Sequence, residues 1–156
     1  LNFNLSHAYW MSGLEPVDPA KGVARFDGRS LAVPDPNRTP FPETGAPVGP
    51  EQGYPYAMAG QTWLTGHGGP TSNGFSAALT GARAVTLHTM RMRIDDQRRV
   101  SGHVSSDSPL VLTLGGNWPS SLRVLLDGSP VTFQQSAGAI ELNLPAGQHA
   151  IVIRPA

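Results

Sequence analysis

The side chains with the clearest chemical potential lie in one stretch, residues 54–75, which reads YPYAMAGQTWLTGHGGPTSNGF. Tyr54 and Tyr56 flank a proline, and exposed aromatic rings of this kind can stack on the C–H faces of sugars. His67 stands between two glycines, and histidine is the most frequent acid–base group in enzymes. Asn73 belongs to a polar run that closes the stretch. We therefore predict that these residues contribute to a surface that meets a ligand or a partner.

Trp118 is the other aromatic candidate for ligand binding. It lies in the turn-like sequence GGNWPSS, where its ring can either present a flat surface to a sugar or anchor the loop by packing. The same choice applies to every aromatic residue here, and the strand-like setting of Trp63 favours the core. The sequence favours the anchoring role for Trp118 and keeps sugar binding as the alternative.

A calcium ion is the one metal for which the sequence offers ligands. Asp95, Asp96 and Asp107 fall in expected loops, and Ca²⁺ takes oxygen ligands. The alternative is that the segment IDDQRR is a polar turn between strands. The histidines lack close metal-ligand spacing, and only His88 and His103 could approach each other, if their strands pair. With no cysteine in the chain, disulfides and thiolate metal sites are excluded.

An enzyme remains a second hypothesis. The run HGGP resembles the oxyanion loop of some α/β-hydrolases, but the chain lacks the G-x-S-x-G elbow and the alternating strand–helix pattern of that fold. No pair of carboxylates can be assigned to glycoside hydrolysis. The enzymatic alternative is that His67 contributes to a glycoside hydrolase or polysaccharide lyase site that another domain or chain completes.

Charge and hydropathy exclude two classes of partner. Eleven basic and eleven acidic residues cancel and are scattered, so the sequence predicts no nucleic-acid partner. No apolar run approaches the length of a membrane-spanning helix, so we expect no membrane insertion. The chain begins at Leu1 without a recognisable signal sequence, and we interpret it as a processed or excised segment.

Alternating apolar residues predict the elements that must position these side chains. Leu110, Leu112 and Leu114 share one face of a strand, and Ile140, Leu142 and Leu144 share another. Ile151 and Ile153 repeat the pattern near the end of the chain. Turn signals recur every 8 to 12 residues, which is typical of a β-sandwich. We therefore predict one all-β domain over residues 1–156, an antiparallel, jelly-roll-like sandwich of about eight to ten strands with little helix.

Several segments carry more specific expectations. Asp127-Gly128 predicts a hairpin over residues 121–134, and Asp27-Gly28 predicts another. In RAVTLHTMRMRI the apolar phase changes at His88-Thr89, which indicates either a β-bulge or two strands at a sheet corner. The segment FSAALTGARAV is the sole helix candidate, and the proline-rich residues 34–53 predict a long surface loop or arm.

Residues 110–156, LVLTLGGNWPSSLRVLLDGSPVTFQQSAGAIELNLPAGQHAIVIRPA, resemble the C-terminal β-sandwich domains of secreted bacterial glycoside hydrolases and polysaccharide lyases. The resemblance covers roughly a third of the chain. It implies a secreted, non-catalytic module that binds carbohydrate weakly or braces an adjacent catalytic domain. A structural domain that packs on a partner through its proline-rich arm is the third alternative.

Overall fold

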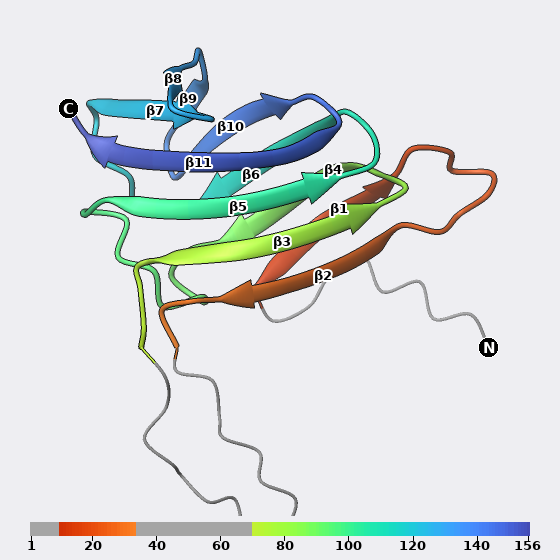
Figure 1. Cartoon of the computed structure of the whole chain (residues 1–156), viewed down its shortest axis with the longest axis horizontal. Helices are drawn as coiled ribbons and strands as arrows, with labels where there is room; N and C mark the ends of the chain where they lie inside the picture. Colours follow the sequence, from red (N-terminus) through yellow and green to blue (C-terminus); the bar gives the residue numbers. More distant parts are fainter. Residues whose placement is uncertain (1–9, 34–69) are drawn as a thin grey trace, which may run out of the picture. The chain divides into compact units, whose positions relative to one another are not determined.

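Two β-sheets packed face to face form the part of the chain that the structure, a computed structural model, describes: residues 10–33 and 70–156 (Figure 1). These residues contain eleven strands and no helix, which confirms the predicted all-β sandwich. Sheet A contains, in spatial order, β1 (Met11–Pro16), β4 (Ala82–His88), β6 (Leu110–Gly115), β10 (Ala139–Leu144) and β9 (Gln134–Ser136). Sheet B contains β2 (Arg25–Ser30), β3 (Gly74–Thr80), β5 (Val100–Ser106), β11 (Gly147–Pro155), β7 (Leu122–Leu126) and β8 (Ser129–Pro130).

Consecutive strands frequently lie in opposite sheets, so that the chain arches across the core. The connections from β3 to β4, from β5 to β6 and from β10 to β11 all cross in this way. The first two arches run in the same direction, so β3 lies parallel to β5 and β4 lies parallel to β6. The remaining strand pairs are antiparallel, and each sheet is therefore mixed.

The β3–β4 arch depends on Gly81. Its φ of +64° lies in the left-handed region that side-chain-bearing residues avoid, and a Cβ there would lie 2.8 Å from the Val23 carbonyl oxygen. The segment FSAALTGARAV therefore forms the two strands of an arch, and the helix candidate is wrong. Alternating burial along both strands supplies enough core area to override the helical preference of its alanines.

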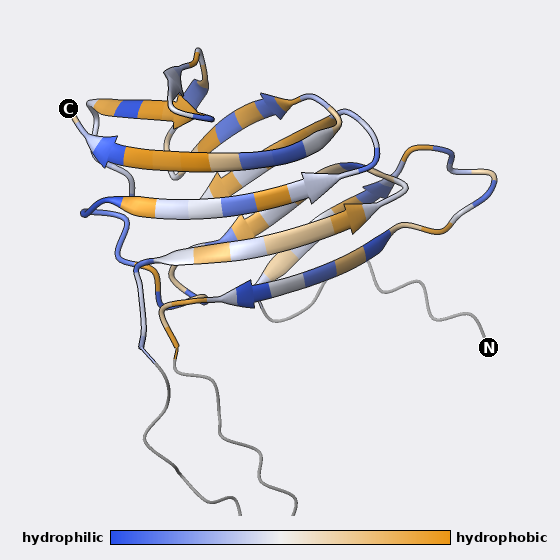
Figure 2. Ribbon diagram, viewed as in Figure 1, coloured by the Kyte–Doolittle hydropathy of each residue, from blue (hydrophilic) through white to orange (hydrophobic). Residues whose placement is uncertain are grey.

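The core lies between the inward faces of the two sheets. Along β10, Ile140, Leu142 and Leu144 are buried, as the alternation predicts, and Ile151 and Ile153 of β11 face them from the other sheet. Hydropathy colouring shows apolar residues recurring along the central strands (Figure 2). Burial of these side chains stabilises the sandwich by about 25 cal/mol per Å² of apolar area removed from water.

The change in the apolar alternation at His88-Thr89 is caused neither by a β-bulge nor by a sheet corner, the two causes that the sequence suggested. Strand β4 ends at His88, and residues 89–93 form a turn. The Met92 N–H donates to the His88 carbonyl at 3.1 Å, and the Ile94 N–H donates to the Thr89 carbonyl at 3.0 Å. Met92 and Ile94 are buried because the turn folds them under the end of the sandwich. Neither a bulge nor a second strand is present.

The two Asp-Gly pairs have opposite outcomes. Asp127 and Gly128 have φ values of +51° and +84° and connect β7 to β8, with Leu126 paired to Ser129, so the predicted turn is confirmed. The returning strand β8 is short and ends at Pro130.

Asp27 and Gly28 lie inside the continuous strand β2, and the hairpin predicted there is wrong. The glycine is needed for space, because a Cβ at Gly28 would lie 2.4 Å from the Phe26 ring and 2.7 Å from the Trp10 ring. These two rings contact each other edge to face, with centroids 5.5 Å apart.

Apart from Pro70, the described residues belong to one compact unit. The predicted arm at 34–53 lies outside the described residues. None of the described residues belongs to a helix long and apolar enough to cross a membrane.

Candidate functional site

Three of the residues predicted to bind a ligand, Tyr54, Tyr56 and His67, lie outside the described residues. Their predicted roles stay predictions. The structure does place Asn73, Trp118 and the three aspartates proposed for calcium, and it gives each of them a role within the fold.

Trp118 belongs to the core. Its side chain is only 9% exposed, and its indole N–H donates to the Leu114 carbonyl at 2.8 Å. The ring therefore anchors the loop after β6, which is the role that the sequence favoured. Its side chain is largely covered and its only donor is used within the fold, and the alternative of sugar binding stays a prediction.

Asn73 holds a neighbouring loop in place. Its Nδ2 donates to the carbonyls of Asp95 at 2.7 Å and Arg99 at 3.0 Å, and its Oδ1 accepts from the Asp95 N–H at 2.7 Å. Both amide hydrogens are thus used within the fold. Asn73 therefore clamps the start of β3 to the loop before β5, and its predicted role in ligand binding stays a prediction.

The three aspartates do not form one calcium site. Asp96 is buried and accepts from Thr89 Oγ1 at 3.3 Å and from the Asn117 N–H at 2.6 Å. Asp107 accepts from the Gly81 N–H at 2.8 Å beyond the opposite end of β5. A seven-residue strand separates them by about 23 Å, a distance that no single ion can bridge. Among the described residues, no group of three or more His, Asp or Glu side chains could hold a metal ion.

His88 and His103 do not approach each other through strand pairing. His88 lies on β4 of sheet A, where its Nε2 is 2.8 Å from Ser12 Oγ, whereas His103 lies on β5 of sheet B. His103 is exposed and contributes to a different feature, described next.

A groove of about 660 Å³ crosses the outer face of sheet B, over β2, β3, β5 and β11. The alternating burial of these strands turns one set of side chains outward, and strand pairing places them in rows across the sheet. Arg29, Ser76, His103 and Ala150 form one row, and Asp27, Ala78, Ser105 and Gln148 form the next.

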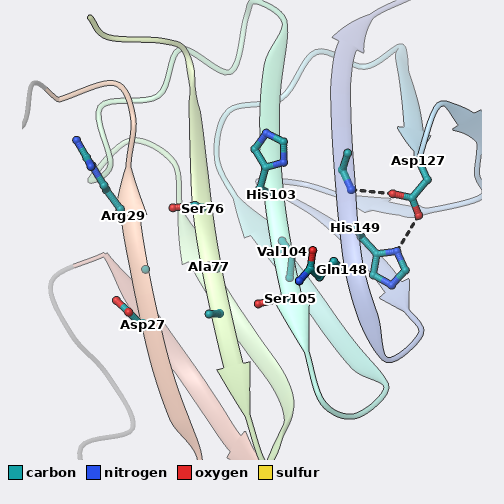
Figure 3. Close-up of a pocket in the computed structure, with 13 residues that line it drawn as sticks. Asp27, Arg29, Ser76, Ala77, His103, Val104, Ser105, Asp127, Gln148 and His149 are labelled. Carbon is teal, nitrogen blue, oxygen red and sulfur yellow. Dashed lines mark hydrogen bonds and ion pairs between the residues drawn. The ribbon is translucent and has the colours of Figure 1, made fainter. Parts of the chain in front are cut away.

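The groove has small residues along its middle and longer polar side chains beside them. Ser76, Ala78 and Ser105 are short, so the sheet surface is open there. Asp27 and Arg29 border it on β2, and His103 and Gln148 rise from β5 and β11 (Figure 3). No tyrosine, tryptophan or phenylalanine is among the described residues that line it, so recognition in this groove would depend on hydrogen bonds.

The far side of the groove is fixed by a pair between Asp127 and His149. His149 Nδ1 lies 2.8 Å from Asp127 Oδ2, its Nε2 lies 3.0 Å from the Pro145 carbonyl oxygen, and its side chain is only 10% exposed. Both partners are acceptors, so both contacts are hydrogen bonds only when both ring nitrogens carry protons. The His149 hydrogen bond, then that from the Ala150 N–H at 2.8 Å, holds the pKa of Asp127 below its ordinary value of 3.8.

We assign this pair a role in positioning the border of the groove, because both nitrogens of His149 contact groups of the fold and its side chain is only 10% exposed. The polar side chains of the groove can instead donate to and accept from the hydroxyls of a bound molecule. The volume lies within the range of about 300–1,000 Å³ that is usual for ligand sites.

Sequence reasoning missed the groove because its residues come from four strands whose order in the sheet is not visible in the sequence. The available signal was the polar parity of VSGHVSS, where Ser101, His103 and Ser105 alternate with buried residues. That pattern indicates that β5 has an outward polar face, but it does not indicate which strands lie beside β5.

No protein-family model, curated protein or solved structure matches the chain.

Proposed function

We propose that the sandwich is a non-catalytic carbohydrate-binding module of a secreted bacterial polysaccharide-processing enzyme, and that it holds a glycan chain in the groove of sheet B. The observation that carries the proposal is the groove itself, with its small-residue floor and its polar borders. Asp27 of β2, His103 of β5 and Gln148 of β11 together supply acceptors and donors across a sheet whose neighbouring strands are about 4.8 Å apart. Sugar hydroxyls both donate and accept, so they match such a surface.

The open form of the groove agrees with binding along a polymer. A ligand that lies across a sheet surface is only partly enclosed and makes few contacts per sugar, so we expect weak affinity. The C-terminal strand pattern of residues 110–156, which resembles accessory domains of carbohydrate-active enzymes, supports the same assignment. The resemblance also allows a role in bracing an adjacent catalytic domain, either together with glycan binding or instead of it.

The test is retention of the chain in native gels that contain soluble polysaccharides, followed by calorimetry with oligosaccharides of the one that binds. We expect Gln148→Ala to weaken binding about two- to tenfold, because it removes an amide that hydrogen-bonds the ligand. His103→Ala should act in the same direction. Asn143→Ala is the matched control, since it removes an exposed amide from the outer face of sheet A.

Equal binding by the wild type and both groove variants would show that the ligand lies elsewhere, with Tyr54 and Tyr56 as the next residues to substitute. Absence of retention on every polysaccharide would contradict the carbohydrate-binding role and leave the bracing role.

A further inference from the structure

Three arginines from neighbouring strands lie at one end of the outer face of sheet B. Arg123 of β7 is directly opposite Arg154 of β11. Arg99 immediately precedes Val100, which pairs with Ile153, so Arg99 flanks Arg154 on its other side. All three residues are exposed, and we call them the arginine row. Figure 2 shows the hydrophilic colour of the end of β11 beside that of β7, at the same end of the sheet.

The arginine row has no ion-pair partner within 4 Å among residues 10–33 and 70–156. None of its three guanidinium groups forms an ion pair there, and Asp95, in the loop that precedes β5, is already paired with Arg98 at 3.3 Å. Strand spacing puts the three Cα atoms within about 10 Å. Like charges directly opposite each other destabilise a strand pair, so a bound anion would relieve a repulsion that the fold leaves uncompensated.

The arginine row and the groove lie on the same strands. Arg99 is four residues before His103 on the path of β5, and Arg154 is four residues after Ala150 on β11. At about 3.3 Å per residue the separation is about 13 Å, which a few sugar units can span. Ser101 and Val152 lie opposite each other between the two features and present no charge. An extended ligand that follows β5 and β11 out of the groove therefore reaches the arginines.

We propose that the arginine row binds carboxylate groups of an acidic glycan whose chain occupies the groove. The inference rests on the proposed carbohydrate-binding function and names the class of glycan. Guanidinium groups suit this role because their planar fork of donors matches a carboxylate in a bidentate pair. A nucleic acid fits less well, because its phosphates need an extended basic stripe and the chain has a net charge of zero.

The experiment compares a galacturonic acid hexasaccharide with its fully methyl-esterified form, which has the same backbone and no charge. Calorimetry at low ionic strength should show the wild type binding the acidic form about tenfold more tightly. Arg123→Gln and Arg154→Gln should each weaken binding of the acidic form about two- to fivefold and leave the ester unaffected, as expected for exposed ion pairs. Added salt should remove the difference in affinity between the acidic and the esterified hexasaccharide.

Arg25→Gln is the matched control. Arg25 is an exposed arginine on the same face, paired with Thr80 at the opposite end of sheet B, and its loss should change neither affinity.

The remaining outcomes of the experiment distinguish failure of the arginine-row proposal from failure of the proposed function. Equal affinity for the two forms, with Gln148→Ala weakening both, would overturn the role proposed for the arginine row and leave glycan binding in the groove in place. Loss of binding in the arginine variants while Gln148→Ala and His103→Ala change nothing would overturn the link between row and groove. Binding of inorganic polyphosphate as tightly as the acidic hexasaccharide, through the same arginines, would overturn the glycan as the ligand class.

Discussion

Asp127 shows how a single residue can shape both a turn and the groove beside it. Its backbone takes the left-handed conformation that the β7–β8 turn requires, which aspartate tolerates better than most residues. Its carboxylate then accepts from the Ala150 N–H and contacts the ring of His149. The residue whose backbone forms the turn thereby also fixes the border of the groove through its side chain.

The substitution Asp127→Asn is expected to lower the stability at neutral pH by a small amount, since the carboxylate is half exposed. The pKa of Asp127 is lowered on folding, so its contribution is present above 3.8 and is lost as the pH falls through the still lower folded value. Urea unfolding from pH 7 to pH 2 should therefore show the two proteins converging at the acid end.

Asp27→Asn serves as the control for this pH series, because Asp27 is exposed and forms no hydrogen bond with the described residues. A difference between wild type and Asp127→Asn that stayed constant down to pH 2 would contradict the expected linkage.

At the scale of the elements, the parallel pairing of β3 with β5 depends on residues of unequal size. Phe75 of β3 is fully buried and lies next to Gly102 of β5, and a Cβ at Gly102 would lie 2.5 Å from the Phe75 ring. The glycine therefore leaves the space that the ring fills. This contact fixes the register of the two strands that form the middle of the groove on the opposite face.

The substitution Gly102→Ala should destabilise the protein by about 1–3 kcal/mol, the usual cost of overpacking a core. Urea unfolding measures the change, and Ser101→Ala, on the outward side of the same strand, should have little effect. A smaller side chain at position 75 should make room for the added methyl group. Gly102→Ala combined with Phe75→Leu should therefore lose less stability than the sum of the two single changes. Strict additivity would show that the two residues are not in contact.

At the scale of the whole molecule, the arches bring distant parts of the chain into one binding face. β2, β3, β5 and β11 are separated by other strands or by long segments of sequence, yet they lie side by side in sheet B (Figure 1). Because the groove exists only when all four strands are assembled, binding to it should stabilise the complete fold.

A glycan at ten times its dissociation constant should add about 1.4 kcal/mol to the stability of the sandwich. For a domain of this size the midpoint of thermal unfolding should rise by roughly 5 °C. Scanning calorimetry with and without the ligand measures the shift, and Gln148→Ala should show less of it at the same ligand concentration. An unchanged midpoint for the wild type at saturating ligand would contradict binding to the folded groove.

The sequence by itself determined the strands of the second half and their inward faces. Ile140, Leu142 and Leu144 alternate because a strand has a period of two, and this periodicity is local. The turn at Asp127-Gly128 was also predictable from the sequence, because both residues accept the left-handed conformation and lie between apolar strands. Asp27-Gly28 is the same pair of residues, but there both residues pair with β3 and Gly28 lies against the rings of Trp10 and Phe26, so the strand continues.

Only the tertiary structure decided which residues make up the candidate site. The outward parity of His103 was visible in its own strand, but its neighbours Ser76 and Ala150 come from strands that the sequence does not order. The physical reason is that side-chain alternation is set by each strand's own geometry, whereas strand order results from burying all the apolar faces in one core. The same distinction explains why three arginines that are far apart in the sequence form a single charged row.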